Sequence, residues 1–207
     1  MSKAANSALK EPVVLPELVD LFRRYPRLQL TRGDEAAYQR FRCREPNLVS
    51  YLDEHGSGGG QRRLQVLVLR AQGQPVGAVS FIVETNRYRP SQANKFARID
   101  LVMVDPSCRG LGFGRLLILC VMTYLLRAHG KSLYSISCLA AHAAVEKSLQ
   151  ELAFAGRPQK DENFQHMELK LEALDLDRLA RQLAQKTATR LQAINFRLRQ
   201  QENAPSR

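Results

Sequence analysis

The sequence is poor in cysteine, and its cysteines lack the spacing of a metal site or a disulfide framework. Four cysteines occur in 207 residues, and none forms a CxxC pair with another: Cys43, Cys108, Cys120 and Cys138. Cys120 falls within a helical pattern, and Cys138 lies near the end of a strand pattern. This usage predicts reduced, mostly buried thiols in a cytoplasmic protein, and we expect no bound metal.

The sequence also lacks a long apolar run and an N-terminal signal segment. We find no apolar stretch of the length that crosses a bilayer. Residues 1–10 carry no apolar segment like that of a signal peptide. The chain is therefore expected to be cytoplasmic and to have no membrane span.

Acidic residues are the minority among the charged ones. The chain has 31 Lys and Arg against 20 Asp and Glu, a formal net charge of +11. Such an excess favours anionic partners, namely phosphorylated ligands, nucleic acid or acidic surfaces, although it also serves solubility alone. The length and the 44% hydrophobic content predict one globular domain with appendages.

A strand, a glycine-rich turn and a helix follow one another in the middle of the chain. The apolar run 99–104 ends at Asp105-Pro106, because proline cannot donate to a sheet ladder and biases the preceding residue away from helix. From Arg115 the apolar residues take helical spacing, and Gly130 stands where a helix ends. The connection between strand and helix is the most informative part of the sequence.

This connection holds three glycines at alternate positions, Gly110, Gly112 and Gly114. Glycines let the backbone turn tightly and bring its N–H groups close to a ligand, and the following helix directs the positive end of its dipole into the turn. The turn is thus predicted to bind phosphate. A glycine-rich connection without a ligand is the alternative.

Two common phosphate-binding motifs do not fit this turn. The P-loop requires Gly-Lys followed by Ser or Thr, but Gly114 is followed by Arg115-Leu116. The dinucleotide fingerprint, counted from Gly110, places Arg115 at its third glycine, and the next strand ends near Cys138 without an acidic residue. The turn must therefore follow another motif.

The remaining pattern is Arg-x-x-Gly-x-Gly at Arg109, Gly112 and Gly114, after a strand that ends in Val-Asp-Pro. In this position it resembles the pyrophosphate-binding motif of the GNAT N-acetyltransferase superfamily, which binds acetyl-coenzyme A. The resemblance implies an α/β (α+β) fold with a central mixed twisted sheet flanked by helices. The order expected over residues 28–171 is strand, two helices, three strands, helix, strand, helix, strand.

Periodicity and breaker residues give the boundaries of these elements. Strands are expected at residues 28–31, 63–71, 76–84, 95–104, 132–138 and 164–171. Helices are expected at residues 16–24, 34–41, 46–54, 115–129 and 142–152. Gly73-Gln74-Pro75 is expected to form a hairpin turn, and the loop 86–94 offers Arg87, Tyr88 and Arg89 as acceptor contacts.

The chain is expected to divide into an N-terminal extension (1–27) with a short helix, a GNAT acetyltransferase domain (28–171) and a basic amphipathic C-terminal helix (172–207). The segment 176–198 of that helix has apolar residues at helical spacing. Its apolar face is expected to pack either on the domain itself or on a second copy of the chain in a homodimer. The alternative is a helix that binds RNA, DNA or anionic lipid.

The resemblance assigns contacts with acetyl-coenzyme A residue by residue. The turn would surround the pyrophosphate, mostly through backbone N–H groups, and the strand would pair its main chain with the pantetheine arm. A backbone N–H near Val102 would polarise the thioester carbonyl. The residues so assigned are Val102, Met103, Val104, Arg109, Gly110, Gly112, Phe113, Gly114 and Arg115.

The candidate catalytic residues depart from the family pattern. The family's second helix often begins with Asn and carries, seven positions later, a Tyr that protonates the leaving thiolate. His142 and Leu149 stand at these positions here. Ser148, Tyr134 or solvent could supply the proton instead, and His142 could relay protons or only cap and pack at its helix start.

Two further polar side chains belong to the predicted strands. Asp100 could act as a base through water, or could pair with Arg98 or another arginine. Cys138 has no activating arrangement in the sequence, so a role as nucleophile is set aside.

The activity implied by the resemblance is direct transfer of an acetyl group to the primary amine of a small molecule or a peptide, without a covalent enzyme intermediate. This reaction needs a neutral amine and a route for its proton. Two alternatives stay open: a GNAT-fold module that binds acetyl-coenzyme A without catalysis, and a nucleic-acid-associated protein that uses its basic C-terminal helix.

Overall fold

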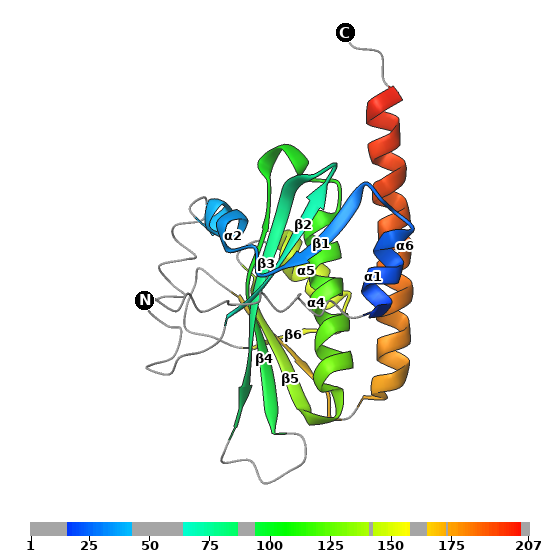
Figure 1. Cartoon of the computed structure of the whole chain (residues 1–207). Coiled ribbons are helices and arrows are strands. Elements are labelled where there is room, and N and C mark those ends of the chain that lie inside the picture. Colours follow the sequence, from blue (N-terminus) through cyan, green and yellow to red (C-terminus); the bar gives the residue numbers. More distant parts are fainter. Residues whose placement is uncertain are drawn as a thin grey trace, which may run out of the picture.

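The protein is built on one mixed sheet of seven strands, ordered β1-β2-β3-β4-β5-β7-β6 (Figure 1). The computed structural model describes residues 16–42, 64–86, 94–140, 143–157, 165–172 and 174–203. The strands are β1 (Leu28–Arg32), β2 (Gln65–Ala71), β3 (Gln74–Thr85), β4 (Lys95–Val104), β5 (Leu133–Ala140), β6 (Ala155–Arg157) and β7 (Gln165–Lys170). The helices are α1 (Pro16–Arg23), α2 (Glu35–Arg42), α4 (Phe113–His129), α5 (Ala143–Gln150) and α6 (Leu176–Asn203). This architecture confirms the expected fold class, including the C-terminal helix.

Helices lie on both faces of the sheet. In Figure 1, α2 lies on one side, and α4 and then α6 lie on the other. The α2 side chains Tyr38 and Phe41 pack with Leu101 and Met103 of β4 in a smaller cluster of buried residues. The larger cluster surrounds α4 and joins the other face of the sheet to α5 and α6.

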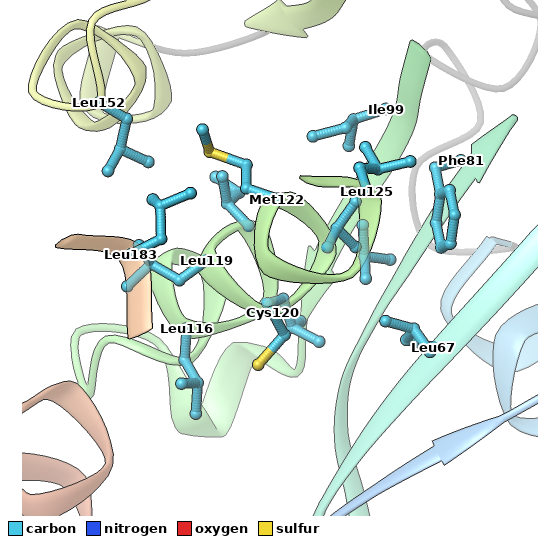
Figure 2. Packing of buried hydrophobic residues seen from close by; sticks show 14 of the residues in the cluster. Leu67, Phe81, Ile99, Leu116, Leu119, Cys120, Met122, Leu125, Leu152 and Leu183 are labelled. Atoms are coloured by element: carbon cyan, nitrogen blue, oxygen red, sulfur yellow. The ribbon is translucent and has the colours of Figure 1, made fainter. Parts of the chain in front are cut away.

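Helix α4 is buried on most of its surface. Figure 2 shows its side chains between Phe81 and Ile99 of the strands and Leu183 of α6. Because it is enclosed by the sheet, α5 and α6, it needs no polar face except near its ends. The broad apolar surface of its sequence follows directly from this position.

The expectation that no apolar run reaches membrane-spanning length was wrong for this helix. Residues Phe113–Ser132 are long and apolar enough, by length and composition, to cross a bilayer. The same segment is 61% buried inside the protein, as the core helix of a globular fold. Composition therefore does not distinguish the two cases here, whereas burial accounts for its apolar character.

Strand β4 contains one extra residue and separates from β5 near its middle. Ser80 pairs with Leu101 and Phe81 pairs with Ile99, so Asp100 has no partner position on β3 and forms a bulge. The parallel pairing of β4 with β5 runs only from Lys95 to Ile99, although β4 continues to Val104. Beyond Ile99, β5 pairs with β7, and the strands that the structure describes leave this edge of β4 unpaired.

Helix α6 packs along α4 within the same chain. Its buried residues recur at helical spacing: Ala180, Leu183, Thr187, Leu191, Ile194 and Leu198. The sequence left open whether the domain itself or a second copy of the chain covers this apolar face. In the structure the domain's own helix α4 covers it. The outward face is mostly polar, with exposed arginines such as Arg181 and Arg199, and it also carries Phe196, which is 60% exposed.

Several expected details differ from the structure or fall outside the described residues. The β2–β3 hairpin turns at Gln72 and Gly73, both with positive φ (51° and 79°), so Gln74 and Pro75 already belong to β3. The short strand β6 was not expected. The expected helix 46–54 and the loop residues Arg87, Tyr88 and Arg89 lie outside the described residues.

Asp34 fixes the start of α2 and should make stability depend on pH. Its Oδ1 accepts a hydrogen bond from the Ala37 backbone N–H at 3.1 Å, and Arg70 of β2 pairs with its Oδ2. The hydrogen bond first, and then Arg70, hold the pKa of Asp34 below its ordinary value. The carboxylate therefore stabilises the fold above about pH 4, and this contribution is lost as pH falls through the lowered folded-state pKa.

We expect Asp34→Asn to lower the free energy of unfolding by about 1 kcal/mol at neutral pH, because asparagine still caps the helix but loses the negative charge that pairs with Arg70 and lies at the helix start. The difference between variant and wild type should shrink as the pH is lowered toward about 2, because protonation removes the same charge from the wild type. Urea unfolding at several pH values measures this difference in the free energy of unfolding. An equal difference at all pH values would contradict the assigned role of the charge.

Candidate functional site

A pocket of about 480 Å³ lies at the carboxyl end of β4. Its walls come from the end of β4, the glycine turn, the first turns of α4, one face of α5, and α6. All nine residues that the sequence assigned to ligand binding line it: Val102, Met103, Val104, Arg109, Gly110, Gly112, Phe113, Gly114 and Arg115. The structure thus brings the predicted strand and turn residues into one site.

The chain leaves β4 through a capped turn. Asp105 Oδ1 accepts hydrogen bonds from the Ser107 backbone N–H at 3.0 Å and from the Ser107 hydroxyl at 2.7 Å. The Asp105 N–H donates to the Val76 carbonyl at 2.9 Å, which ties the end of β4 to the start of β3. These bonds form the short 3-10 turn η1 (Pro106–Cys108), from which the glycine turn continues.

The glycine turn adopts a backbone that requires glycine at two positions. Gly110 has φ +81° and Gly112 has φ +93°, a region that side chains with a Cβ rarely adopt. Gly112 caps α4, and its carbonyl accepts the first helical hydrogen bond, from the Leu116 N–H at 3.1 Å. The N–H groups of the first helical turn, at residues 113–115, have no partner within the helix and lie at the pocket. Such a helix start favours an anion.

The open edge of β4 forms another wall of the pocket. Val102, Met103 and Val104 lie beyond Ile99, where pairing with β5 has stopped. Every second residue of a strand directs its main-chain N–H and C=O groups to the same edge, so an open edge offers these groups at regular spacing, as an added strand would use them. This edge suits an extended ligand that carries amide groups.

Arginines concentrate around the turn, and two of them come from α6. Arg190 lines the pocket, and a Cβ built on Gly112 would lie 3.1 Å from its Nη1. Arg197 donates from its Nη1 to the carbonyls of Gly110, at 3.1 Å, and Leu111, at 3.4 Å. Burial lowers the pKa of Arg190, with smaller contributions from Arg115 and Arg197.

Neither arginine of α6 was predicted from the sequence. They are seven residues apart, so they share one face of the helix, but they belong to a basic stretch in which nothing marks them. Arg115, which was assigned to the pyrophosphate, lines the pocket as expected and also forms an ion pair with Glu151, just after α5.

Of the expected catalytic residues that the structure describes, Ser148 lies at the pocket, whereas Asp100 and Tyr134 do not line it. It sits on α5 beside Val145, whereas Leu149, at the family's tyrosine position, is fully buried in the core. His142 lies outside the described residues. Tyr134 lies near the amino end of β5, level with the start of β4, and packs against Phe96 with 6.1 Å between ring centroids. It is therefore at the wrong end of the strand to protonate a leaving group in the pocket.

Asp100 is buried in the bulge of β4 and accepts a hydrogen bond from the Arg98 Nε at 2.5 Å. The structure thus shows the ion pair that the sequence left as one of two readings. Asp100 is not among the residues that line the pocket. A base role would require a proton path from the bulge to the acceptor.

The thiols of Cys120 and Cys138 are poor nucleophiles, because burial raises the pKa of each to about 12. This agrees with setting Cys138 aside as a nucleophile. Cys108 is half-buried at the pocket. Within the described ranges, no three or more His, Cys, Asp or Glu side chains are grouped as a metal would need.

Comparison with known proteins agrees with the fold. Residues 16–154 match the model of the acetyltransferase (GNAT) family. A search of curated proteins found no match to the chain.

Among solved structures, the KacTA–DNA complex has 20% sequence identity and a TM-score of 0.51 over 74% of this chain and 99% of that one. A mutant AtaT toxin bound to the C-terminus of the antitoxin AtaR has 16% identity and a TM-score of 0.51, over 74% and 98%. The ribosomal-protein-S18-alanine N-acetyltransferase from Escherichia coli has 17% identity and a TM-score of 0.49, over 71% and 98%.

Proposed function

The chain belongs to the GNAT acetyltransferase family, and from this membership we propose that it transfers the acetyl group of acetyl-coenzyme A to the primary amine of an acceptor, a small molecule or a peptide. The observation that carries the proposal is the pocket itself. It joins a helix start built from glycines to the open edge of a strand, and so pairs an anion site with an amide-binding edge.

The residues of the pocket fit acetyl-coenzyme A at its pyrophosphate and along its pantetheine arm. The N–H groups of residues 113–115 and the nearby arginines suit the pyrophosphate, which carries two negative charges. The edge of Val102–Val104 suits the two amides of the pantetheine arm. A turn blocked by side chains, or a β4 that stayed paired with β5, would not accept such a ligand.

The reaction then places few demands on side chains. The acceptor nitrogen bonds to the acetyl carbonyl carbon, the carbon–sulfur bond breaks, the nitrogen gives up a proton and the sulfur gains one. A backbone N–H near Val102 would stabilise the charge that develops on the carbonyl oxygen. When bound, acetyl-coenzyme A supplies the activated acyl group.

Purified protein tests the proposal with two measurements. Calorimetry should show binding of acetyl-coenzyme A, and a thiol assay should show release of coenzyme A with at least one member of a panel of small amines, lysine peptides and free peptide N-termini. The absence of binding would overturn the proposal. Binding without release by any amine would favour a module that binds acetyl-coenzyme A, a reading that the buried Leu149 supports. A salt-dependent gel shift with RNA would instead support nucleic-acid association.

Ser148 is our candidate for the group that assists the leaving thiolate, because it is the polar side chain that α5 directs to the pocket. We expect Ser148→Ala to lower kcat about tenfold, the effect of losing one hydrogen bond to a charged group, with the Kd for acetyl-coenzyme A unchanged. Lys147→Ala, on the exposed side of α5, is the matched control. An unchanged kcat would assign the proton to solvent or to another group.

A further inference from the structure

Two arginine side chains of helix α6 contact the glycine turn. Its buried face holds it along α4, with Leu191 and Ile194 fully buried. From this position Arg190 reaches over Gly112 and lines the pocket, and Arg197 binds the carbonyls of Gly110 and Leu111. A helix outside the family-matched residues 16–154 therefore supplies part of the pocket wall.

We propose that Arg190 is a phosphate-binding residue of this pocket, which pairs with the pyrophosphate of acetyl-coenzyme A above Gly112. The inference rests on the proposed function. The guanidinium lies beside Gly112, which caps α4, and lines the same pocket as residues 113–115; its planar donors match two phosphate oxygens at once. Arg197 acts as a positioning residue, since it fixes the turn to α6.

The charge balance of the site supports an anionic ligand. Burial lowers the pKa of Arg190, and the neighbouring charges of Arg115 and Arg197 lower it further. In the described part of the chain, Glu151 is the carboxylate that acts on Arg190, and it already pairs with Arg115. Arg115 and Arg190 are both half-buried, and a pyrophosphate would supply a further negative charge that favours two guanidinium groups at such a site.

Calorimetry on the full chain tests the proposal with two ligands, coenzyme A and dephospho-coenzyme A, which lacks the 3′-phosphate but keeps the pyrophosphate. We expect Arg190→Ala to weaken both by about 10- to 100-fold. Arg190→Lys should recover only part of this, because an ammonium cannot bind two oxygens in a fork. Arg199→Ala removes the same charge from the opposite face of α6 and should leave both affinities unchanged.

The outcomes separate this inference from the proposed function. If the wild type binds both ligands and Arg190→Ala binds them with the same affinity, the inference about Arg190 is overturned and the proposed function is not. A loss for coenzyme A without a loss for dephospho-coenzyme A overturns the pyrophosphate assignment in favour of the 3′-phosphate. No binding by the wild type overturns both. Without ligand, Arg190→Ala should have the same melting temperature as Arg199→Ala. A lower melting temperature in Arg190→Ala alone would assign Arg190 a structural role.

Discussion

Gly112→Val is expected to weaken the binding of acetyl-coenzyme A at least 100-fold, beyond what calorimetry readily measures. Valine at φ +93° is strained by about 1–3 kcal/mol, so the turn must rearrange and its N–H groups lose their direction. The added side chain would also meet Arg190, whose Nη1 lies 3.1 Å from the Cβ position. The substitution thus acts on the backbone donors and on the arginine together.

The hairpin glycine Gly73 provides a matched control. It has φ +79°, with no atom within 4 Å of a Cβ built on it, and it joins β2 to β3 away from the pocket. Gly73→Val should therefore carry a similar backbone strain and keep wild-type affinity. If Gly112→Val binds as tightly as this control, the turn does not bind the pyrophosphate and the site assignment is wrong.

The double substitution Leu183→Asp with Leu191→Asp should release α6 from α4. Both leucines are buried against the core, and each contributes roughly 1.5–3 kcal/mol, to which the cost of placing a carboxylate in an apolar contact is added. An isolated basic helix of this length is marginal in water, so the released segment should unfold. Hydrogen exchange should become fast throughout 176–203, and binding of acetyl-coenzyme A should weaken because Arg190 leaves the pocket.

Two exposed positions on the same helix control for the added charge. Gln182→Asp with Gln192→Asp should preserve slow exchange. Slow exchange throughout α6 in the leucine variant would refute the packing argument. Light scattering adds the oligomeric state: a wild-type dimer that becomes monomeric would show that a second copy also covers this helix.

The elements that could be predicted from sequence are those whose pattern is local. Pro106 ends β4, the alternate glycines form the turn, and the leucine spacing of residues 176–198 gives α6. The residues assigned to the pyrophosphate followed from a motif that is contiguous in sequence, so their meeting at one pocket needed no knowledge of distant contacts. The helix start moved from Arg115 to Phe113, because a glycine cap carries no side-chain signal.

Features that depend on how distant segments meet could not be predicted. Arg190 reaches the turn only because α6 packs on α4 in one particular register, which its apolar spacing does not fix. The sequence left two roles open for Asp100, as a base and as the partner of an arginine. Its place in a bulge separates the two, and that bulge depends on how β4 pairs with β3. Tyr134 was excluded as the proton donor by its position near the amino end of β5, and this position depends on the register between β5 and β4.

The extra residue in β4 makes the sheet less regular and leaves one edge of the strand open. Residues before and after Asp100 already face the correct sides, with Ile99 toward α4 and Leu101 toward α2, so losing one residue there would not invert the strand. It would straighten β4 and allow its ladder with β5 to continue past Ile99. A single-codon deletion at position 100 would then yield a protein with more sheet hydrogen bonds and no groove for a ligand, whereas a missense change there would keep the groove.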